Sequence, residues 1–186
     1  PQIAVWNMAQ LATALLPLLE NSDAAVAEAT EIVHAMSDQV ETAWRKRFAA
    51  KIGIISPSID DGALIDDLLL LMQKDGADFT NTFRALSGDE AAAQFSDRDG
   101  FAAWQEKWRA RVATEDNPES VMNAANPVII PRNHRIEEMI QAAVAGDMAP
   151  FNRLMNALAS PFTPTDPDLH RPPSQDEIVP ATFCGT

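Results

Sequence analysis

The chain has 186 residues, 46% of them hydrophobic, with a formal net charge of −13 and a single cysteine. This composition is typical of a globular protein of one domain or slightly more, and no apolar run is long enough to cross a membrane. The negative charge excludes the basic surface that binds nucleic acid. One cysteine and the lack of an export signal argue against a secreted, disulfide-held fold and predict a cytoplasmic location.

Apolar residues at helical spacing predict helices along most of the chain. The predicted helices are 2–20 with a kink or early end at Pro17, 24–51, one opened by Asp60 or Asp61 and ended by Gly76, a short one capped by Asp78, 97–113, 134–145, and one from Asp147 to Ala159. Asn117-Pro118 is interpreted as the start of a loop. No alternating pattern predicts a strand. We therefore expect an all-α chain, with a helical domain at 1–159 and an extended, Pro-rich tail at 160–186.

The acidic residues suggest metal sites, and each has a simpler explanation. Asp97, Asp99, Gly100 and Glu106 fit positions three, five, six and twelve of a calcium loop, but position one is then Phe95, which has no oxygen ligand. Asp97 is therefore interpreted as a helix cap. The pair Asp60-Asp61 is interpreted as a cap, and Asp66-Asp67 as the exposed side of a helix.

The histidines and the cysteine leave one catalytic alternative open. His34, His134 and His170 show no spacing typical of a metal site. Cys184 could act as a nucleophile with His134 or His170 as its base, since such partners meet in the fold and not in the sequence. No motif assigns a catalytic residue, a metal ligand or a cofactor ligand to this chain.

The exposure of two tryptophans distinguishes a helix of the core from a surface that binds another protein. Trp104 and Trp108 lie on one helical face with Phe101 and Val112, which favours a position in the core. If they were exposed, the chain would instead be an acidic helical protein-interaction module.

The least generic segment runs from Asn126 to Glu138. Its prolines restrict the backbone, and Asn133 is predicted to cap a helix with Glu137 or Glu138 reaching back to it. Arg132 and Arg135 flank this cap. They are the best candidates in the chain for a buried salt bridge or a docking contact.

Three separated motifs carry a family resemblance. They are Pro1-Gln2-Ile3-Ala4-Val5-Trp6-Asn7 with the Leu-rich run at 14–19, the segment 126–138, and the ending Thr182-Phe183-Cys184-Gly185-Thr186. Ala145-Gly146-Asp147 and Pro172-Pro173 stand at the expected places between them. In this order the motifs resemble the selenoprotein O family, which are protein adenylyltransferases with a protein-kinase-like fold.

The resemblance implies a function for an intact parent protein. Members of the family transfer AMP from ATP to Ser, Thr or Tyr hydroxyls of proteins, with Mg²⁺ or Mn²⁺, through residues that precede the motif found here at 1–7. We therefore expect this chain to be the helical C-terminal part of such an enzyme, inactive alone, whose partners are the upstream catalytic part and the protein substrates.

The resemblance also assigns a role to Cys184. This residue stands where some members carry selenocysteine, third from the end. The family implies a redox residue in the tail that can bond to a cysteine of the catalytic part. The alternative to this interpretation is an acidic interaction module with no enzymatic parent.

Overall fold

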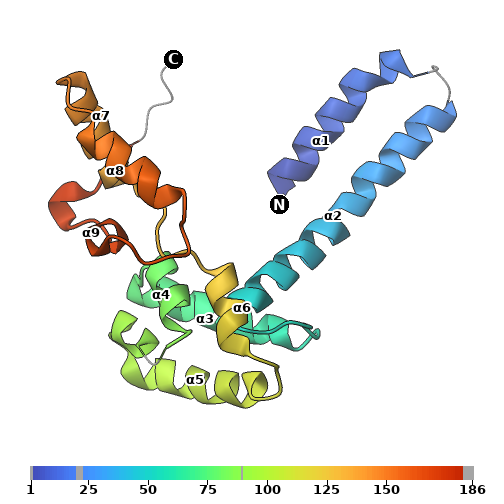
Figure 1. Ribbon diagram of the computed structural model, residues 1–186. Coiled ribbons are helices and arrows are strands. Elements are labelled where there is room, and N and C mark those ends of the chain that lie inside the picture. The colour runs from blue at the N-terminus through green and yellow to red at the C-terminus, as the bar shows by residue number, and fades with distance from the viewer. Residues whose placement is uncertain (1, 20–22, 89, 182–186) are drawn as a thin grey trace. The chain divides into compact units, whose positions relative to one another are not determined.

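The computed structural model describes residues 2–19, 23–88 and 90–181, and within these ranges it contains helices and loops but no strand (Figure 1). The expected all-α class is therefore confirmed. The chain divides into two compact units, Pro1–Phe48 and Ala49–Thr186. The division predicted at 159/160 stays a prediction. No helix in the described part combines the length and the apolar character needed to cross a bilayer.

The helices follow the predicted order closely. Their bounds are α1 Gln2–Leu15, α2 Asp23–Lys51, α3 Asp61–Asp75, α4 Phe79–Ala85, α5 Arg98–Val112, α6 Pro118–Ala125, α7 Asn133–Val144, α8 Ala149–Leu158 and α9 Pro167–His170, with single 3₁₀ turns at Leu16–Leu18, Ala91–Gln94 and Gln175–Glu177. Pro17 lies in the 3₁₀ turn that follows α1, so the predicted early end is confirmed. Gly76 ends α3 in the left-handed conformation that the prediction requires.

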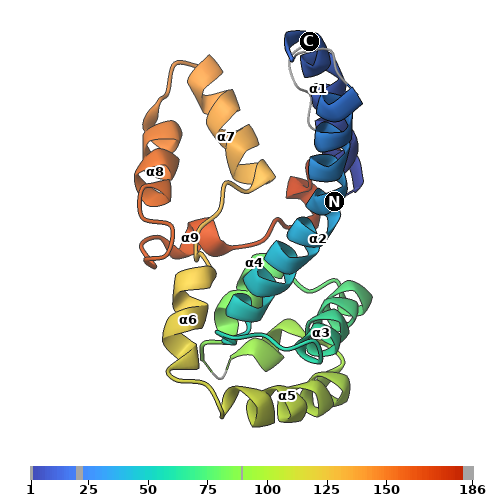
Figure 2. The same cartoon turned by 90° about the vertical axis from the view of Figure 1, so that its right-hand side faces the viewer.

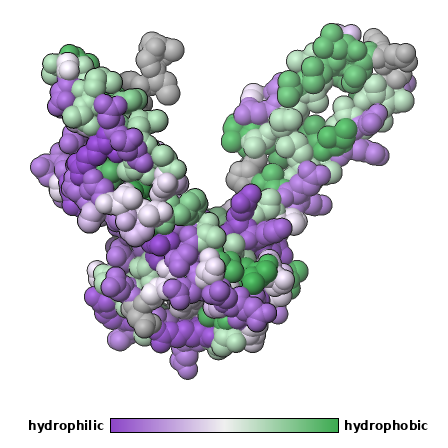
Figure 3. All heavy atoms as spheres, viewed as in Figure 1, coloured by the Kyte–Doolittle hydropathy of each residue, from purple (hydrophilic) through white to green (hydrophobic). Residues whose placement is uncertain are grey.

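The first unit exposes most of its large apolar side chains. Figure 3 shows hydrophobic residues gathered over α1 and the part of α2 that belongs to this unit. The exposed members are Ile3, Trp6, Met8, Leu11, Leu15, Leu18, Leu19, Val26 and Ile32. Among the described residues before Ala49, none is a buried hydrophobic.

The second unit has a core built around α5. Trp104 and Trp108 are buried and stack with ring centroids 5.5 Å apart. The indole of Trp104 donates to the carbonyl of Leu64 at 2.9 Å, and that of Trp108 donates to the carbonyl of Ile52 at 2.8 Å. Both tryptophans therefore belong to the core. They cannot form the binding surface that the interpretation as an interaction module requires.

The expected loop at Asn117-Pro118 is wrong, because these residues begin α6. Proline has no N–H to lose at the first helical position and its φ already suits a helix. The side chain of Asn117 accepts from the backbone N–H of Ser120 at 3.3 Å and caps the helix. Gly53 permits this approach: it has a φ of 84°, and a Cβ there would lie 2.9 Å from the Cβ of Pro118.

The tail is more ordered than an extended chain. It contains α9 and the turn Gln175–Glu177, and Leu169 is buried with Val128 and Leu154 in one apolar cluster. The carbonyl of Pro161 accepts from the backbone N–H groups of residues 128 and 129 at 2.8 and 3.1 Å. α7 and α8 form a helical hairpin beside this segment, as Figures 1 and 2 both show. Cys184 lies outside the described residues.

Candidate functional site

Two of the acidic residues that suggested metal sites, Asp97 and Asp61, have structural partners. Asp97 accepts from the backbone N–H of Gly100 at 2.9 Å and caps α5, as predicted. Asp61 is buried and accepts from Arg111 at 2.8 Å and from the backbone N–H of Ser58 at 2.7 Å. Asp60 holds the N-cap position of α3 without a side-chain bond, and Asp66-Asp67 is exposed as predicted.

The described residues contain no cluster of metal-ligating side chains. Nowhere in 2–19, 23–88 and 90–181 do three His, Cys, Asp or Glu side chains gather closely enough to hold a metal ion. A magnesium-bound nucleotide needs carboxylate oxygens for the metal in addition to cationic groups for the phosphates.

The three histidines that were considered as candidate site residues differ in their burial. His34 is exposed on α2, His134 is buried in the first turn of α7, and His170 is half-buried at the end of α9. Burial lowers the pKa of both His134 and His170, and nearby arginines lower it further. Their pairing with Cys184 as catalytic bases stays a prediction.

Arg132 forms the buried salt bridge that the sequence suggested. It is 8% exposed, and its Nη1 and Nη2 atoms donate to the two carboxylate oxygens of Asp78 at 2.7 and 2.9 Å. Burial alone would raise the pKa of Asp78, but the bonds from Arg132 and from the backbone N–H of Asn81 hold that pKa below its usual value. Since Asp78 also caps α4, one carboxylate joins two distant segments of the chain.

The predicted capping box of α7 is wrong. Arg132 holds the N-cap position and makes no side-chain cap bond, while Asn133 is already the first helical residue. Glu138 accepts from Arg135 at 2.7 Å and Glu137 accepts from Gln141 at 2.9 Å, so neither reaches back to the cap. The ion pair of Arg132 with α4 directs the chain into α7 instead.

The side chain of Asn126 links three helices, a role that the sequence pattern did not predict. Its Nδ2 donates to the carbonyls of Lys51 at 2.8 Å and Phe83 at 3.2 Å, and its Oδ1 accepts from the Lys51 ammonium at 3.2 Å. Arg84 donates to the Asn126 carbonyl at 3.3 Å. Burial lowers the pKa of Lys51. A single amide thus connects the ends of α2, α4 and α6.

Three further arginines hold the tail. Arg135 donates to Asp168, and Arg153 donates to Asp166 at 2.6 and 2.9 Å. Arg171 binds both oxygens of Glu177 at 2.6 Å and holds the pKa of that carboxyl well below its usual value. The ion pairs of Arg135 and Arg153, together with the burial of Leu169, hold residues 166–169 against α7 and α8. The Arg171–Glu177 pair lies within the tail itself.

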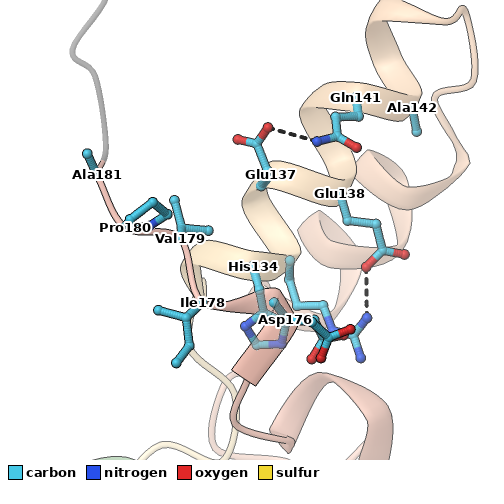
Figure 4. Close-up of a pocket in the computed structure, with 12 residues that line it drawn as sticks. His134, Glu137, Glu138, Gln141, Ala142, Asp176, Ile178, Val179, Pro180 and Ala181 are labelled. Carbon is cyan, nitrogen blue, oxygen red and sulfur yellow. Dashed lines mark hydrogen bonds and ion pairs between the residues drawn. The ribbon is translucent and has the colours of Figure 1, made fainter. Parts of the chain in front are cut away.

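A large pocket opens between α7 and the end of the described tail (Figure 4). We call it the α7–tail pocket. Its volume is about 910 Å³, and its walls are His134, Arg135, Glu137, Glu138, Gln141 and Ala142 on α7 and residues 176–181 of the tail. The prediction of a redox tail concerns the residues that follow this segment in the sequence.

Comparison with known proteins places the chain in a family. A family model described as "Protein adenylyltransferase SelO" matches residues 1–159, so the chain belongs to the SelO family. This confirms the resemblance drawn from its three motifs. The match covers the α1 sequence, the segment around Arg132 and the helices α7 and α8.

The relatives carry a related name and are much longer. The chain is 60% identical over 186 residues to the "Protein nucleotidyltransferase YdiU" of Roseobacter denitrificans, which it covers to 40% of its length. Proteins of the same name from Ruegeria pomeroyi and Alkaliphilus metalliredigens are 57% and 40% identical, also covered to 40%. All 186 residues of the chain are matched in each case. The chain therefore spans about 40% of the length of these curated relatives.

Proposed function

We propose that this chain is the helical part of a protein adenylyltransferase, which transfers AMP from ATP to hydroxyl groups of target proteins. The observation that carries the proposal is its membership of the SelO family together with its match to about 40% of the length of the relatives. In this proposal the chain works with a catalytic part that corresponds to the remaining length of those relatives. ATP and Mg²⁺ or Mn²⁺ bind to that catalytic part, and the protein works in the cytoplasm.

The exposed apolar face of the first unit supports such a partner. Ile3, Trp6 and Leu18 are 68%, 57% and 80% exposed. A contiguous apolar surface of this kind is typical of a face that another protein surface covers. We assign this face to the catalytic part.

Reconstitution tests the assignment. The chain is mixed with the complementary part of the Roseobacter denitrificans relative, and transfer of labelled AMP is measured in the presence of Mg²⁺ or Mn²⁺. We expect no transfer by the chain alone, because the electrostatic stabilisation of phosphoryl transfer needs groups that the described residues do not bring together. Metal-dependent labelling by the chain alone would contradict the proposal.

A variant pair tests the apolar face in the same assay. Trp6→Glu places a charge on the face, and we expect it to weaken association with the catalytic part. Val144→Glu is the control, since Val144 is 85% exposed on α7 and lies outside this face. If both variants bound the catalytic part equally well, the apolar face would not be the surface that contacts it.

The tail has a separate test. We propose that Cys184 is a redox residue that bonds to a cysteine of the catalytic part, in a tail that begins near residue 160. Non-reducing gels of the reconstituted protein should show a cross-link that Cys184→Ser abolishes without changing the far-UV circular dichroism of the chain. A cross-link that persists in this variant would refute the role.

A further inference from the structure

The 172–181 segment of the tail has no polar contact with α7. Within the described ranges, its hydrogen bonds and ion pairs are made inside the segment and with Arg171, which binds both carboxylate oxygens of Glu177. The preceding helix α9 is fixed differently, because Leu169 is buried and Asp168 accepts from arginines of α7 and α8. Residues 172–181 can therefore leave α7 while α9 stays in place.

His134 lies where this segment meets α7. The residue is 7% exposed, and its Nε2 atom is buried without a hydrogen-bond partner in the described part of the chain. It lines the α7–tail pocket together with residues 176–181, and Figure 4 shows its imidazole beside the tail near Asp176. Buried polar atoms almost always have a partner. The contact between the tail and α7 thus encloses a ring nitrogen that no described residue satisfies.

Positive charge surrounds His134. Arg132 and Arg135 lie near it at the start of α7, Arg171 approaches from the tail, and each disfavours the protonated imidazole. The ring also belongs to the first turn of α7, where the backbone N–H groups carry partial positive charge and no acidic residue compensates them. Burial and the three arginines lower the pKa of His134. At neutral pH the ring is therefore uncharged.

The acidic side chains around the pocket offer the ring no acceptor. The charge of Glu177 favours the protonated imidazole, but its two oxygens bind an arginine of the tail at 2.6 Å. Glu138 pairs with an arginine of α7 at 2.7 Å, and Glu137 accepts from an amide one turn further along α7 at 2.9 Å. Asp176 is the fourth carboxylate on the pocket walls. None of the four accepts a hydrogen bond from Nε2 of His134.

Protonation of the ring changes this contact. A protonated imidazole donates from both of its nitrogens, so the Nε2–H group of His134 would be buried without an acceptor while the tail covers it. A buried charge without a partner is costly, whereas water solvates the ring once the 172–181 segment has moved away. Imidazole is also the side chain whose charge ordinarily changes between about pH 5 and pH 8, a range in which arginine stays charged.

We propose that His134 is a proton-sensitive contact that controls the docking of the 172–181 segment on α7: the uncharged ring holds the segment, and the protonated ring releases it. The proton comes from solvent and binds to the imidazole, and no other bond forms or breaks. Since the pKa of His134 is lowered in the docked chain, docking is strongest above the usual value of 6.5 and weakens as the pH falls below it. The docking equilibrium should shift by up to about tenfold for each pH unit below that value.

NMR spectroscopy of the whole chain tests the proposal. Ring carbon shifts report the protonation of each histidine, and the heteronuclear NOE of the Ile178, Val179 and Ala181 amides reports fast motion of the segment. Between about pH 7.5 and about pH 5 we expect rigid amides to become mobile. The midpoint of this change should coincide with the titration of the His134 ring and lie below its usual pKa. A segment that stays rigid throughout, or one whose midpoint differs from that of the ring, would overturn the proposal.

A matched pair of variants isolates the ring. His134→Gln replaces the imidazole with a side chain that does not titrate, and His34→Gln makes the same change at an exposed position of α2. We expect the pH dependence of segment motion to disappear in the first variant, whether glutamine holds the segment or leaves it mobile at every pH. It should persist unchanged in the second. A pH response that survives in His134→Gln would refute the proposal and assign the release to another group, such as His170.

Discussion

The two units of the chain differ in where their apolar side chains lie. In the first unit Trp6 and Leu18 are 57% and 80% exposed, whereas in the second Phe83 and Trp104 are 1% and 3% exposed. All buried hydrophobic residues among those described lie at Ala49 or later. The second unit therefore has a core of its own, whereas the described residues of the first unit include no buried hydrophobic side chain.

The largest expected difference comes from removing one large side chain in each unit. Phe83→Ala should lower the free energy of unfolding by about 3–5 kcal/mol, because it leaves a cavity in the core. Trp6→Ala should change it by less than about 0.5 kcal/mol. Urea unfolding followed by far-UV circular dichroism measures both. Similar losses in the two variants would show that the first unit has a core after all.

A second test removes the buried ion pair of the second unit. Arg132→Met leaves the carboxylate of Asp78 without its bidentate partner, and the free energy of unfolding should fall by about 3 kcal/mol. Arg98→Met is the control, since Arg98 is exposed and forms no salt bridge with a described residue. A loss as small as that of the control would mean that solvent replaces the ion pair.

The same pair predicts a dependence on pH. The pKa of Asp78 is lower in the folded chain than its usual value near 3.9. The ionised carboxylate therefore contributes fully to the free energy of unfolding above this usual pKa, and the contribution is lost as the pH falls through the folded pKa. We expect Asp78→Asn to be less stable than the unmodified chain above about pH 5, with a gap that narrows below about pH 4. Thermal unfolding across this range measures the gap, and a constant gap would contradict the assignment.

The smallest effect is expected at the surface. Arg153 is 44% exposed in its side chain and pairs with Asp166 and Asp168. Arg153→Gln should cost less than about 1 kcal/mol, and the loss should shrink in high salt, because exposed pairs are screened. A larger loss of stability that does not depend on salt would show that the ion pairs of Arg153 are shielded from solvent like the buried pair of Arg132.

Most of the fold could be predicted from local patterns. Apolar spacing and the caps at Asp78, Asp97 and Gly76 located helices that the structure confirms, because these signals act within one or two turns. The helix after Asn117 was missed because an Asn-Pro pair begins a loop and a helix equally well. The outcome there depends on the close approach of Gly53 to Pro118, which local sequence does not reveal.

The candidate site was predicted only in part. Arg132 was singled out by its position beside a helix start, but its partner Asp78 lies 54 residues away and no spacing rule connects them. Asn126 was overlooked because its three side-chain hydrogen bonds go to Lys51 and Phe83, which belong to two other segments of the chain. The α7–tail pocket likewise requires the tail to return to α7. Such sites exist only once distant segments have packed.

The position of Asn126 also bears on chemical ageing of the protein. Spontaneous deamidation of asparagine proceeds through attack by the backbone nitrogen of the next residue, and the residue that follows Asn126 is Pro127, which has no N–H. The buried amide is thereby protected from turning into an acid. An aspartate at this position would offer no donor to the carbonyls of Lys51 and Phe83 and would open the junction of three helices.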